Sequence, residues 1–457
     1  MQGVFIIGEQ RSGSNLLRIM LAGGGLAAPH PAHVLSRLYP ILQSYGDLSR
    51  EPNWLQLVED CCQLVERNPI PWSPLEEFDR SDIANRCRER SLVAIFGALM
   101  DTYAEANGAT AWVCKSMGAV NFVDELDAYF DNPKYIYLYR DARDVTLSFT
   151  KAVVGEKHPY HIARRWAARQ RSCIAERERL GADRVHSVSY EELTANPSWV
   201  LKDLCEFLEI PFTDEMLRGH ESKDAVSAVK KSQLWENLDQ PVLKTNSRKF
   251  LSGLDRESIL IVESLAGDVL DQLGYDRVCG SEGESVIFSE EQVRCFTQEN
   301  EALKAEQRAA MDPEDADRRR QQLMLLTDRV YFLKDIDRED RLRFLSFVEE
   351  EHYQEGDVVI SGEESSTDMF FVISGVLEMI PDSQRKRLIK AGEPLGEFSF
   401  ITGQAGNAAV ICQERARLFR LTRDAFAELE TNNPRLAVRV LHLIAEHLSI
   451  RLAGSTR

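Results

Sequence analysis

Basic and hydroxyl side chains follow two apolar runs of this chain, where each run gives way to a polar turn. Residues 4–7 lead into a turn that contains Arg11. Residues 135–139 lead directly to Arg140, with Ser148 eight positions later. Guanidinium and hydroxyl groups bind phosphate-type anions through charge-assisted hydrogen bonds. The two turns therefore predict a ligand with two separated anionic groups.

The first turn has the composition of an anion-binding loop. Gly8 and Gly13 allow a tight turn and a close approach of the backbone to a ligand. Backbone amides at the start of the following helix would point at an anion, with the helix dipole assisting. The residues of this loop that we expect to contact the ligand are Arg11, Ser12, Gly13, Ser14, Asn15 and Leu16. An ordinary strand-to-helix turn is the alternative interpretation.

A phosphate-binding loop of the kinase type is a second alternative, because four residues separate Gly8 from Gly13. Loops of that type continue with Lys and then with Ser or Thr. This chain has Ser14 and Asn15 at those two positions. The sequence therefore disfavours ATP and magnesium chemistry, and no metal is expected.

The elements around both turns follow from the apolar pattern. Each run is short, as expected of strands that are buried on both faces of a sheet. Either Asp141 or Asp144 could open the helix that carries Ser148. Open α/β sheets bind ligands at the carboxyl ends of their strands. We therefore predict an α/β fold with a P-loop-like parallel sheet and flanking helices.

Taken together and in this order, the two segments resemble the 5′-phosphosulfate loop and the 3′-phosphate-binding motif of one family. These are the sulfotransferases that use 3′-phosphoadenosine-5′-phosphosulfate (PAPS). The resemblance implies the sulfotransferase fold and PAPS as the sulfuryl donor. It also implies that Arg11 contacts the 5′ side, while Arg140 and Ser148 hold the 3′-phosphate. The similarity extends over about residues 1–276.

Further segments resemble the same family. Lys115 ends an apolar stretch similar to that of tyrosylprotein and related bacterial sulfotransferases, which implies that it lies near the transferring sulfuryl group. Tyr190 lies in a stretch that resembles a later motif of the family. Ser247 and Lys249 lie in a stretch that resembles the mobile loop closing over the nucleotide. The resemblance therefore adds Tyr190, Ser247 and Lys249 to the candidate cofactor-binding residues.

Sulfuryl transfer to a hydroxyl needs a base, and many members of the family place a Glu or a His after the phosphosulfate loop. Residues 29–35 contain no carboxylate, so a histidine is the candidate. His33 is the first choice because it directly precedes an apolar helical pattern, and His30 is the second. The pKa of a histidine lies near working pH, which suits the task. Alternatively, either histidine only positions this Pro-rich turn.

Composition limits the class of protein. The 457 residues should form two or three domains. The formal net charge of −18 argues against general binding of nucleic acid or anionic membranes. No apolar run approaches the ~18 residues of a membrane span, and no signal-peptide pattern precedes the first strand. The 9 cysteines lack metal-ligand or secreted-disulfide spacing. We therefore expect a cytoplasmic protein with reduced, mostly buried cysteines.

The pattern changes after about residue 326 to short strands with turn residues, then to helices after Arg420. Residues 353–360, 369–373 and 376–380 are the predicted strands. This part resembles the cyclic-nucleotide-binding domain, a β-roll followed by helices. Glu397 matches the family's ribose-binding Glu, but Gly406 stands where the family has its phosphate-binding Arg. Cyclic nucleotide is therefore not an expected ligand, and a degenerate fold used for contacts is favoured.

We predict a sulfotransferase domain at residues 1–276, a linker with a helix at 277–325, and a cyclic-nucleotide-binding-like domain at 326–457. The linker helix has a thin apolar face; a solvated connector is favoured over packing on a neighbour or a homodimer contact. Alternatives to the enzyme are a non-catalytic nucleotide sensor and a P-loop kinase. Residues 30–110 should line the pocket for an acceptor hydroxyl. The candidates for its walls are Tyr39, Trp54, Trp72 and Phe78. Alternatively, these aromatic residues belong to the hydrophobic core.

Overall fold

The structure is a computed structural model of the chain. It describes residues 1–68, 70–152, 155–222, 225, 239–242, 246–279, 286–309, 336–361, 367–380, 386–404 and 408–455. The chain divides into two compact units, one with residues 1–35 and 68–312 and the other with residues 36–67 and 313–457. The segment 36–67 thus groups with the C-terminal part of the chain, although its sequence position lies inside the first predicted domain.

The first unit is built on a four-stranded parallel sheet with the order β2-β1-β3-β4. Its strands are β1 (Gln2–Gly8), β2 (Ala111–Cys114), β3 (Lys134–Tyr139) and β4 (Val185–Ser189). Phe5 of β1 pairs with Cys114 on one side and with Tyr135 on the other. Because the strands run in the same direction, the segments after β1 and β3 leave the sheet at the same edge. The predicted α/β fold with a parallel sheet is confirmed.

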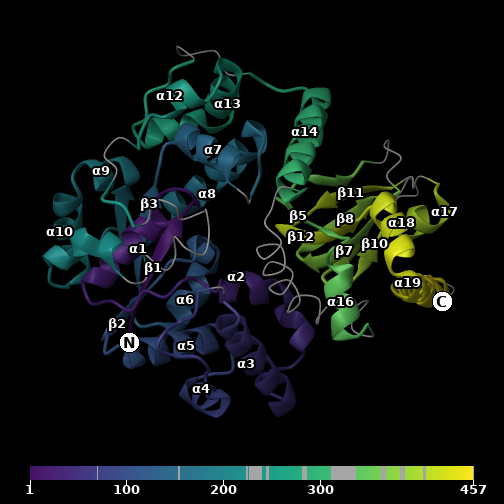
Figure 1. The fold of residues 1–457 in the computed structure, drawn as a ribbon, viewed down its shortest axis with the longest axis horizontal. Helices are drawn as coiled ribbons and strands as arrows, with labels where there is room; N and C mark the ends of the chain where they lie inside the picture. The colour runs from purple at the N-terminus through teal and green to yellow at the C-terminus, as the bar shows by residue number, and fades with distance from the viewer. Residues whose placement is uncertain are drawn as a thin grey trace. The chain divides into compact units, whose positions relative to one another are not determined.

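Helices follow and flank these strands (Figure 1). Those that carry or support the site are α1 (Ser14–Gly23), α7 (Ala142–Lys151), α8 (Pro159–Leu180), α9 (Tyr190–Ala195), α12 (Phe250–Gly253) and α14 (Glu290–Ala309). The other helices in the described part of this unit are α2 (Val34–Leu38), which begins in this unit, α4 (Arg80–Arg86), α5 (Leu92–Ala106), η2 (Met117–Phe122), α6 (Val123–Tyr129), α10 (Pro197–Leu208), η3 (Asp214–Glu221) and α13 (Arg256–Gln272).

Side chains alternate between the two buried faces of the sheet, as strands covered on both sides require. On one face, Ile6 belongs to a core cluster with Leu17 of α1 and Leu204 of α10. On the other face, the Tyr137 hydroxyl donates to Gln170 of α8 at 2.6 Å. This two-sided burial anchors the start of both loops that leave the carboxyl edge.

Helix α14 packs on the first unit, so the interpretation as a solvated connector was wrong. The ring of Phe296 stacks on His158 with centroids 4.5 Å apart, and it lies 5.4 Å from Tyr160 of α8. Asn300 is only 2% exposed. The apolar face of this helix is thin in the sequence because much of the contact is made by one aromatic ring and one buried amide.

The second unit holds two antiparallel sheets with the orders β10-β7-β12-β5 and β6-β11-β8-β9. The strands are β5 (Glu349–Tyr353), β6 (Val358–Ile360), β7 (Met369–Ser374), β8 (Val376–Ile380), β9 (Arg387–Lys390), β10 (Pro394–Leu395), β11 (Ala409–Cys412) and β12 (Ala416–Leu421). The strand predicted over residues 353–360 is two strands, because Gly356 turns the chain between them with φ of 81°. The predicted β-roll with helices is otherwise confirmed.

Among its described residues, five helices and a 3-10 turn complete this unit. They are η1 (Tyr39–Tyr45), α3 (Glu51–Glu66), α16 (Arg338–Phe344), α17 (Glu397–Thr402), α18 (Arg423–Asn432) and α19 (Pro434–Ser455). The turn η1 contacts β7, and Arg37 lies close to Glu350 and Arg417. Burial, aided by Arg417, lowers the pKa of Arg37 to about 10. Residues 37–45 are therefore packed against the sheet that contains β5, β7 and β12.

Two expectations from composition concern cysteines and membranes. Every cysteine is a free thiol, and Cys61, Cys62, Cys114, Cys173, Cys205 and Cys412 are buried, as expected of reduced structural cysteines. Within the described ranges, no helix combines the length and the apolar character that crossing a membrane requires.

Candidate functional site

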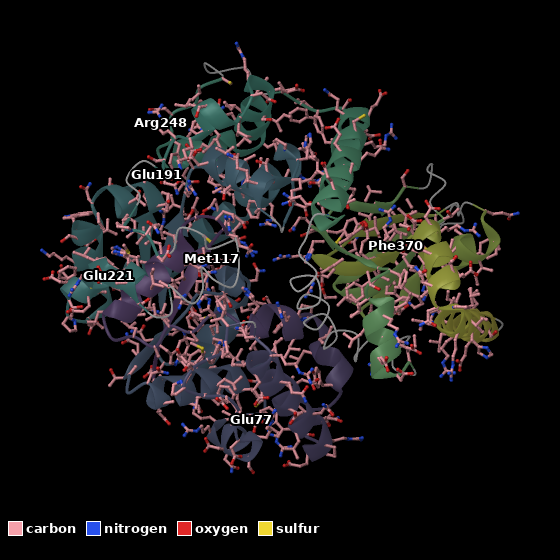
Figure 2. The ribbon with its side chains drawn as sticks, viewed as in Figure 1. Glu77, Met117, Glu191, Glu221, Arg248 and Phe370 are labelled. Atoms are coloured by element: carbon pink, nitrogen blue, oxygen red, sulfur yellow. The ribbon has the colours of Figure 1, made fainter. Side chains whose placement is uncertain are left out.

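The loop between β1 and α1 is shaped by two glycines. Gly13 has φ of 88° and opens α1. A Cβ atom at Gly13 would lie 2.3 Å from the Tyr190 ring. Gly8 has φ of 140°, and a Cβ atom there would lie 2.1 Å from the Leu138 carbonyl oxygen. Met117, labelled in Figure 2, lies against Gly8 from η2. Only glycine fits these positions, so the loop can lie close to β3.

Arg11 and Ser148 meet at the end of this loop. The Nε atom of Arg11 donates to the Ser148 Oγ at 2.9 Å. Ser148 is carried by α7, which begins after Asp141, whose carboxylate accepts the Arg143 N–H at 2.9 Å. Of the two predicted caps for this helix, Asp141 is therefore the one that opens it. The structure brings together a loop residue and a helix residue that the sequence assigned to opposite ends of one ligand.

Arg140 is held between three segments. Its Nη1 donates to the Arg11 carbonyl at 3.0 Å and its Nη2 to the Asn246 carbonyl at 2.8 Å. Its guanidinium lies 4.3 Å from the centre of the Tyr190 ring, and Asn246 donates to the Tyr190 hydroxyl at 2.6 Å. Tyr190 and Arg140, both predicted at the site, therefore lie in direct contact.

Two buried donors at this site lack a hydrogen-bond partner within the described part of the chain. They are the Oγ of Ser12 and the Nε of Arg140. Arg140 is only 7% exposed and Ser12 is fully buried. An unsatisfied buried donor costs roughly 1–3 kcal/mol. The residues present therefore fit an anionic group that accepts hydrogen bonds from both, such as a phosphate.

The remaining predicted cofactor residues follow the same backbone. Ser14, Asn15 and Leu16 form the first turn of α1, where helical N–H groups lack intrahelical partners. Ser247 and Lys249 lie in the turn before α12, and Lys249 is exposed. Their placement in one unit with Arg140 agrees with the prediction, and their contact with a ligand remains a prediction.

Asp144 is a site residue that sequence inspection did not assign. Its carboxylate accepts the Arg248 N–H at 2.7 Å and the Phe250 N–H at 3.0 Å; Arg248 is labelled in Figure 2. Burial raises the pKa of Asp144, although Arg140 acts in the opposite direction. Asp144 thus anchors the turn that carries Asn246. The only signal in the sequence was the second Asp after Arg140, which is equally consistent with a helix cap.

His33 and Lys115 line the same small pocket. Its lining is otherwise mostly apolar: Pro29, Pro31, Ala32, Val34, Trp72, Phe96, Met100, Cys114 and Ser116. Nδ1 of His33 lies 3.4 Å from the Ser116 Oγ. Burial, together with the nearby positive charges of Arg18 and Arg11, lowers the pKa of Lys115 to about 7. The pocket therefore combines a histidine with a lysine whose charge is easily changed.

His30 occupies a different environment. Its Nε2 lies 3.0 Å from Nη2 of Arg18, and its carbonyl accepts hydrogen bonds from Trp72 at 2.7 Å and Asn68 at 3.1 Å. A guanidinium only donates, so Nε2 of His30 must accept and its lone pair is engaged. This geometry favours a structural role for His30 and leaves His33 as the histidine of the pocket.

The four aromatic residues predicted as pocket walls belong to two different units. Trp72 lines the pocket, and Phe78 packs on it with ring centroids 6.2 Å apart. Tyr39 and Trp54 belong to the second unit.

In the second unit, Glu397 opens α17 after Gly396, which has φ of 82°. The Glu397 side chain is buried, and one of its oxygens lies 3.9 Å from Nε2 of His447. Gly406, which stands where the resemblance places the phosphate-binding Arg, lies outside the described residues. The absence of that Arg is a property of the sequence alone.

Comparison with known proteins identifies both domains. Residues 3–214 match the model of the sulfotransferase family, and residues 350–433 match the model of the cyclic nucleotide-binding domain. The chain therefore carries a sulfotransferase-family domain at its N-terminal end and a cyclic nucleotide-binding domain at its C-terminal end, as the residue patterns predicted.

Individual relatives are distant. A protein-tyrosine sulfotransferase of Drosophila melanogaster is 24% identical over 281 residues, which cover 60% of this chain and 51% of the fly protein. An uncharacterized protein of Aquifex aeolicus is 24% identical over 244 residues, which cover 51% of this chain and 29% of that protein. This chain therefore spans about half, or less, of the length of these two relatives.

A solved structure of a sulfotransferase domain from the curacin biosynthetic pathway is also similar. It is 22% identical, covers 61% of this chain and 99% of its own chain, and has a TM-score of 0.42.

Proposed function

We propose that this protein transfers a sulfuryl group from PAPS to a hydroxyl of an acceptor molecule. The observation that carries the proposal is the meeting of Arg11, Ser148 and Arg140 at one edge of the sheet. Ser12 and Arg140 each offer a buried donor without a partner among the described residues. A nucleotide with a 3′-phosphate and a 5′-phosphosulfate supplies two separated anions for such donors.

In the proposed reaction, the acceptor oxygen forms a bond to sulfur while the bond from sulfur to the 5′-phosphate oxygen breaks. His33 takes the acceptor proton, because it is the histidine of the pocket and a neutral imidazole accepts a proton near working pH. Lys115 lies in the same pocket and stabilises negative charge on the transferring group or on the departing phosphate oxygen. Arg11 and the amides at the start of α1 bind the 5′ side of the donor.

The acceptor pocket is mainly apolar and contains Trp72, Phe96 and Met100. Such a surface binds the carbon skeleton beside the reacting hydroxyl by burial of apolar area. The C-terminal domain acts in regulation or in protein contacts, and its cassette lacks the Arg that would compensate a cyclic phosphate.

Calorimetry with four nucleotides tests the donor assignment. The protein should bind PAPS and its product, 3′-phosphoadenosine-5′-phosphate (PAP), more tightly than ATP or cyclic AMP. Transfer from labelled PAPS to a panel of phenols, sugars, tyrosine peptides and lipid hydroxyls then tests the reaction. Equal affinity for PAP and ADP would remove the basis of the proposal, since ADP lacks the 3′-phosphate.

A further inference from the structure

The loop between α7 and α8 is tied to the end of the helix that carries Ser148. Nζ of Lys157 donates to the Phe149 carbonyl at 3.0 Å and also to the carbonyl of Ala152. Lysine side chains near the C-terminal end of a helix can donate hydrogen bonds to its last carbonyls. Lys157 is only 4% exposed, so this cap is shielded from solvent. The position of Lys157 therefore restrains the C-terminal end of α7.

Asn300 of α14 holds this loop in place. Its Oδ1 accepts the N–H of Lys157 at 2.8 Å and the N–H of His158 at 3.0 Å. Its Nδ2 donates to Oε2 of Glu156 at 2.6 Å. One buried amide thus binds three consecutive residues of the loop. A side chain that accepts from two adjacent amides and donates to a third group fixes both the place and the direction of the backbone.

Aromatic packing fixes α14 in the register that this amide requires. Phe296, one turn before Asn300, stacks on the His158 ring at 4.5 Å and lies 5.5 Å from the Phe288 ring. His158 also caps α8, because its Nδ1 accepts the Tyr160 N–H at 3.2 Å. The contacts of α14 therefore converge on the junction between α7 and α8.

We propose that Asn300 is a positioning residue for the 3′-phosphate site, an inference that rests on the function proposed above. It acts through the loop on Lys157, through Lys157 on the end of α7, and through α7 on Ser148 and its contact with Arg11. Helix α14 lies beyond the residues that match the sulfotransferase family model, which end at residue 214. The sulfotransferase domain of this chain therefore depends on a helix from the segment that leads to the C-terminal domain.

The test measures how well the full-length protein distinguishes PAP from ADP. Asn300→Ala should weaken PAP binding by roughly tenfold, the effect of about 1.4 kcal/mol. ADP binding should change much less, because ADP has no 3′-phosphate for Ser148 and Arg140 to hold. The ratio of the two dissociation constants should therefore fall, whereas turnover at saturating PAPS should be largely kept.

A paired exchange tests the hydrogen bond itself. Asn300→Asp alone places a carboxylate against Glu156 and should weaken PAP binding. Combining it with Glu156→Gln reverses the direction of that bond at unchanged net charge, and should restore most of the PAP preference. The matched control is Gln298→Ala, an exposed position on the same helix, which should leave both affinities unchanged.

The outcomes separate the two proposals. If the unaltered protein shows no preference for PAP over ADP, the proposed function fails. A second outcome is that the unaltered protein shows the preference while Asn300→Ala keeps the same ratio of dissociation constants and only lowers the melting temperature or the fraction of binding-competent protein. In that case Asn300 has a purely structural role and the inference is overturned. If Asn300→Ala does not fold, the paired exchange decides, because failure to regain the ratio in the folded double variant also overturns the inference.

Discussion

Arg11 and Ser148, which are far apart in the sequence, are joined by a 2.9 Å hydrogen bond from Nε to Oγ. The resemblance assigned Arg11 to the 5′ side and Ser148 to the 3′-phosphate, yet here the two groups contact each other. In the proposed function, each of the two residues donates a hydrogen bond to its own anionic group of the nucleotide. The pair therefore links the two halves of the proposed donor site.

Arg140→Ala should weaken PAP binding by about tenfold to a hundredfold, because a hydrogen bond to a charged group contributes roughly 1.5–3 kcal/mol. The affinity for ADP should fall less. Titration calorimetry measures both. Arg171→Ala is the control, since Arg171 is an exposed residue paired with Asp268 at 2.9 Å and surface pairs contribute little. An equal loss of both affinities in Arg140→Ala would contradict a role at the 3′-phosphate.

His33→Ala should keep PAP affinity and lower kcat by roughly 10²–10⁴-fold, the usual contribution of a general base. His30→Ala should mainly lower the melting temperature, since it removes one of the hydrogen-bond partners of the buried Arg18 guanidinium. Single-turnover assays with labelled PAPS, corrected for folded protein, measure the difference. Survival of turnover in His33→Ala with loss in His30→Ala would move the base to His30. Activity in both would assign the proton to the acceptor or to another residue.

Binding of PAP should take up a proton above neutral pH. The pKa of Lys115 is lowered to about 7, so free Lys115 is mostly neutral at pH 8, and a bound anion favours the charged form. Affinity should therefore be greatest below pH 7 and should fall as the pH rises through that value. Calorimetry at pH 8 in buffers of different ionisation enthalpy counts the protons.

Two variants assign that proton. Lys115→Arg keeps the charge at all relevant pH values, so PAP binding to this variant should take up little or no proton. Lys115→Met should also show little proton uptake, and it should bind PAP more weakly. Lys157, whose pKa burial lowers to about 8, is a second group that can take up this proton. Uptake that persists unchanged in both Lys115 variants would point to Lys157 and count against the assignment.

The C-terminal domain should show no thermal shift with millimolar cyclic AMP or cyclic GMP, because Gly406 stands where the phosphate-binding Arg is expected. A ligand at about 100 times its dissociation constant would stabilise the domain by roughly 2.7 kcal/mol, which a melting curve detects easily. A shift of that size with either nucleotide would show that the domain senses a second messenger.

The sequence by itself determined the elements and the local chemistry of the donor site. Both loops are short strand–turn–helix units, and their glycines, hydroxyls and arginines lie within a few residues of the strand ends. Hydrophobic runs and glycine positions predict such units because their geometry depends mainly on neighbours in the chain. The parallel sheet, the start of α7 near Asp141 and the β-roll followed from these local patterns.

The tertiary structure alone decided which remote segments meet. Asp144 binds the amides of Arg248 and Phe250, and Asn300 binds those of Lys157 and His158. Neither pair leaves a local pattern, because an Asp or Asn is equally compatible with a cap, a turn or solvent. The same holds for His30 and His33, which are close in sequence but lie in different environments. The buried Arg18 contacts His30, whereas His33 lines the pocket. Long-range packing decides such contacts, since the chain must fold before these groups lie within hydrogen-bonding distance.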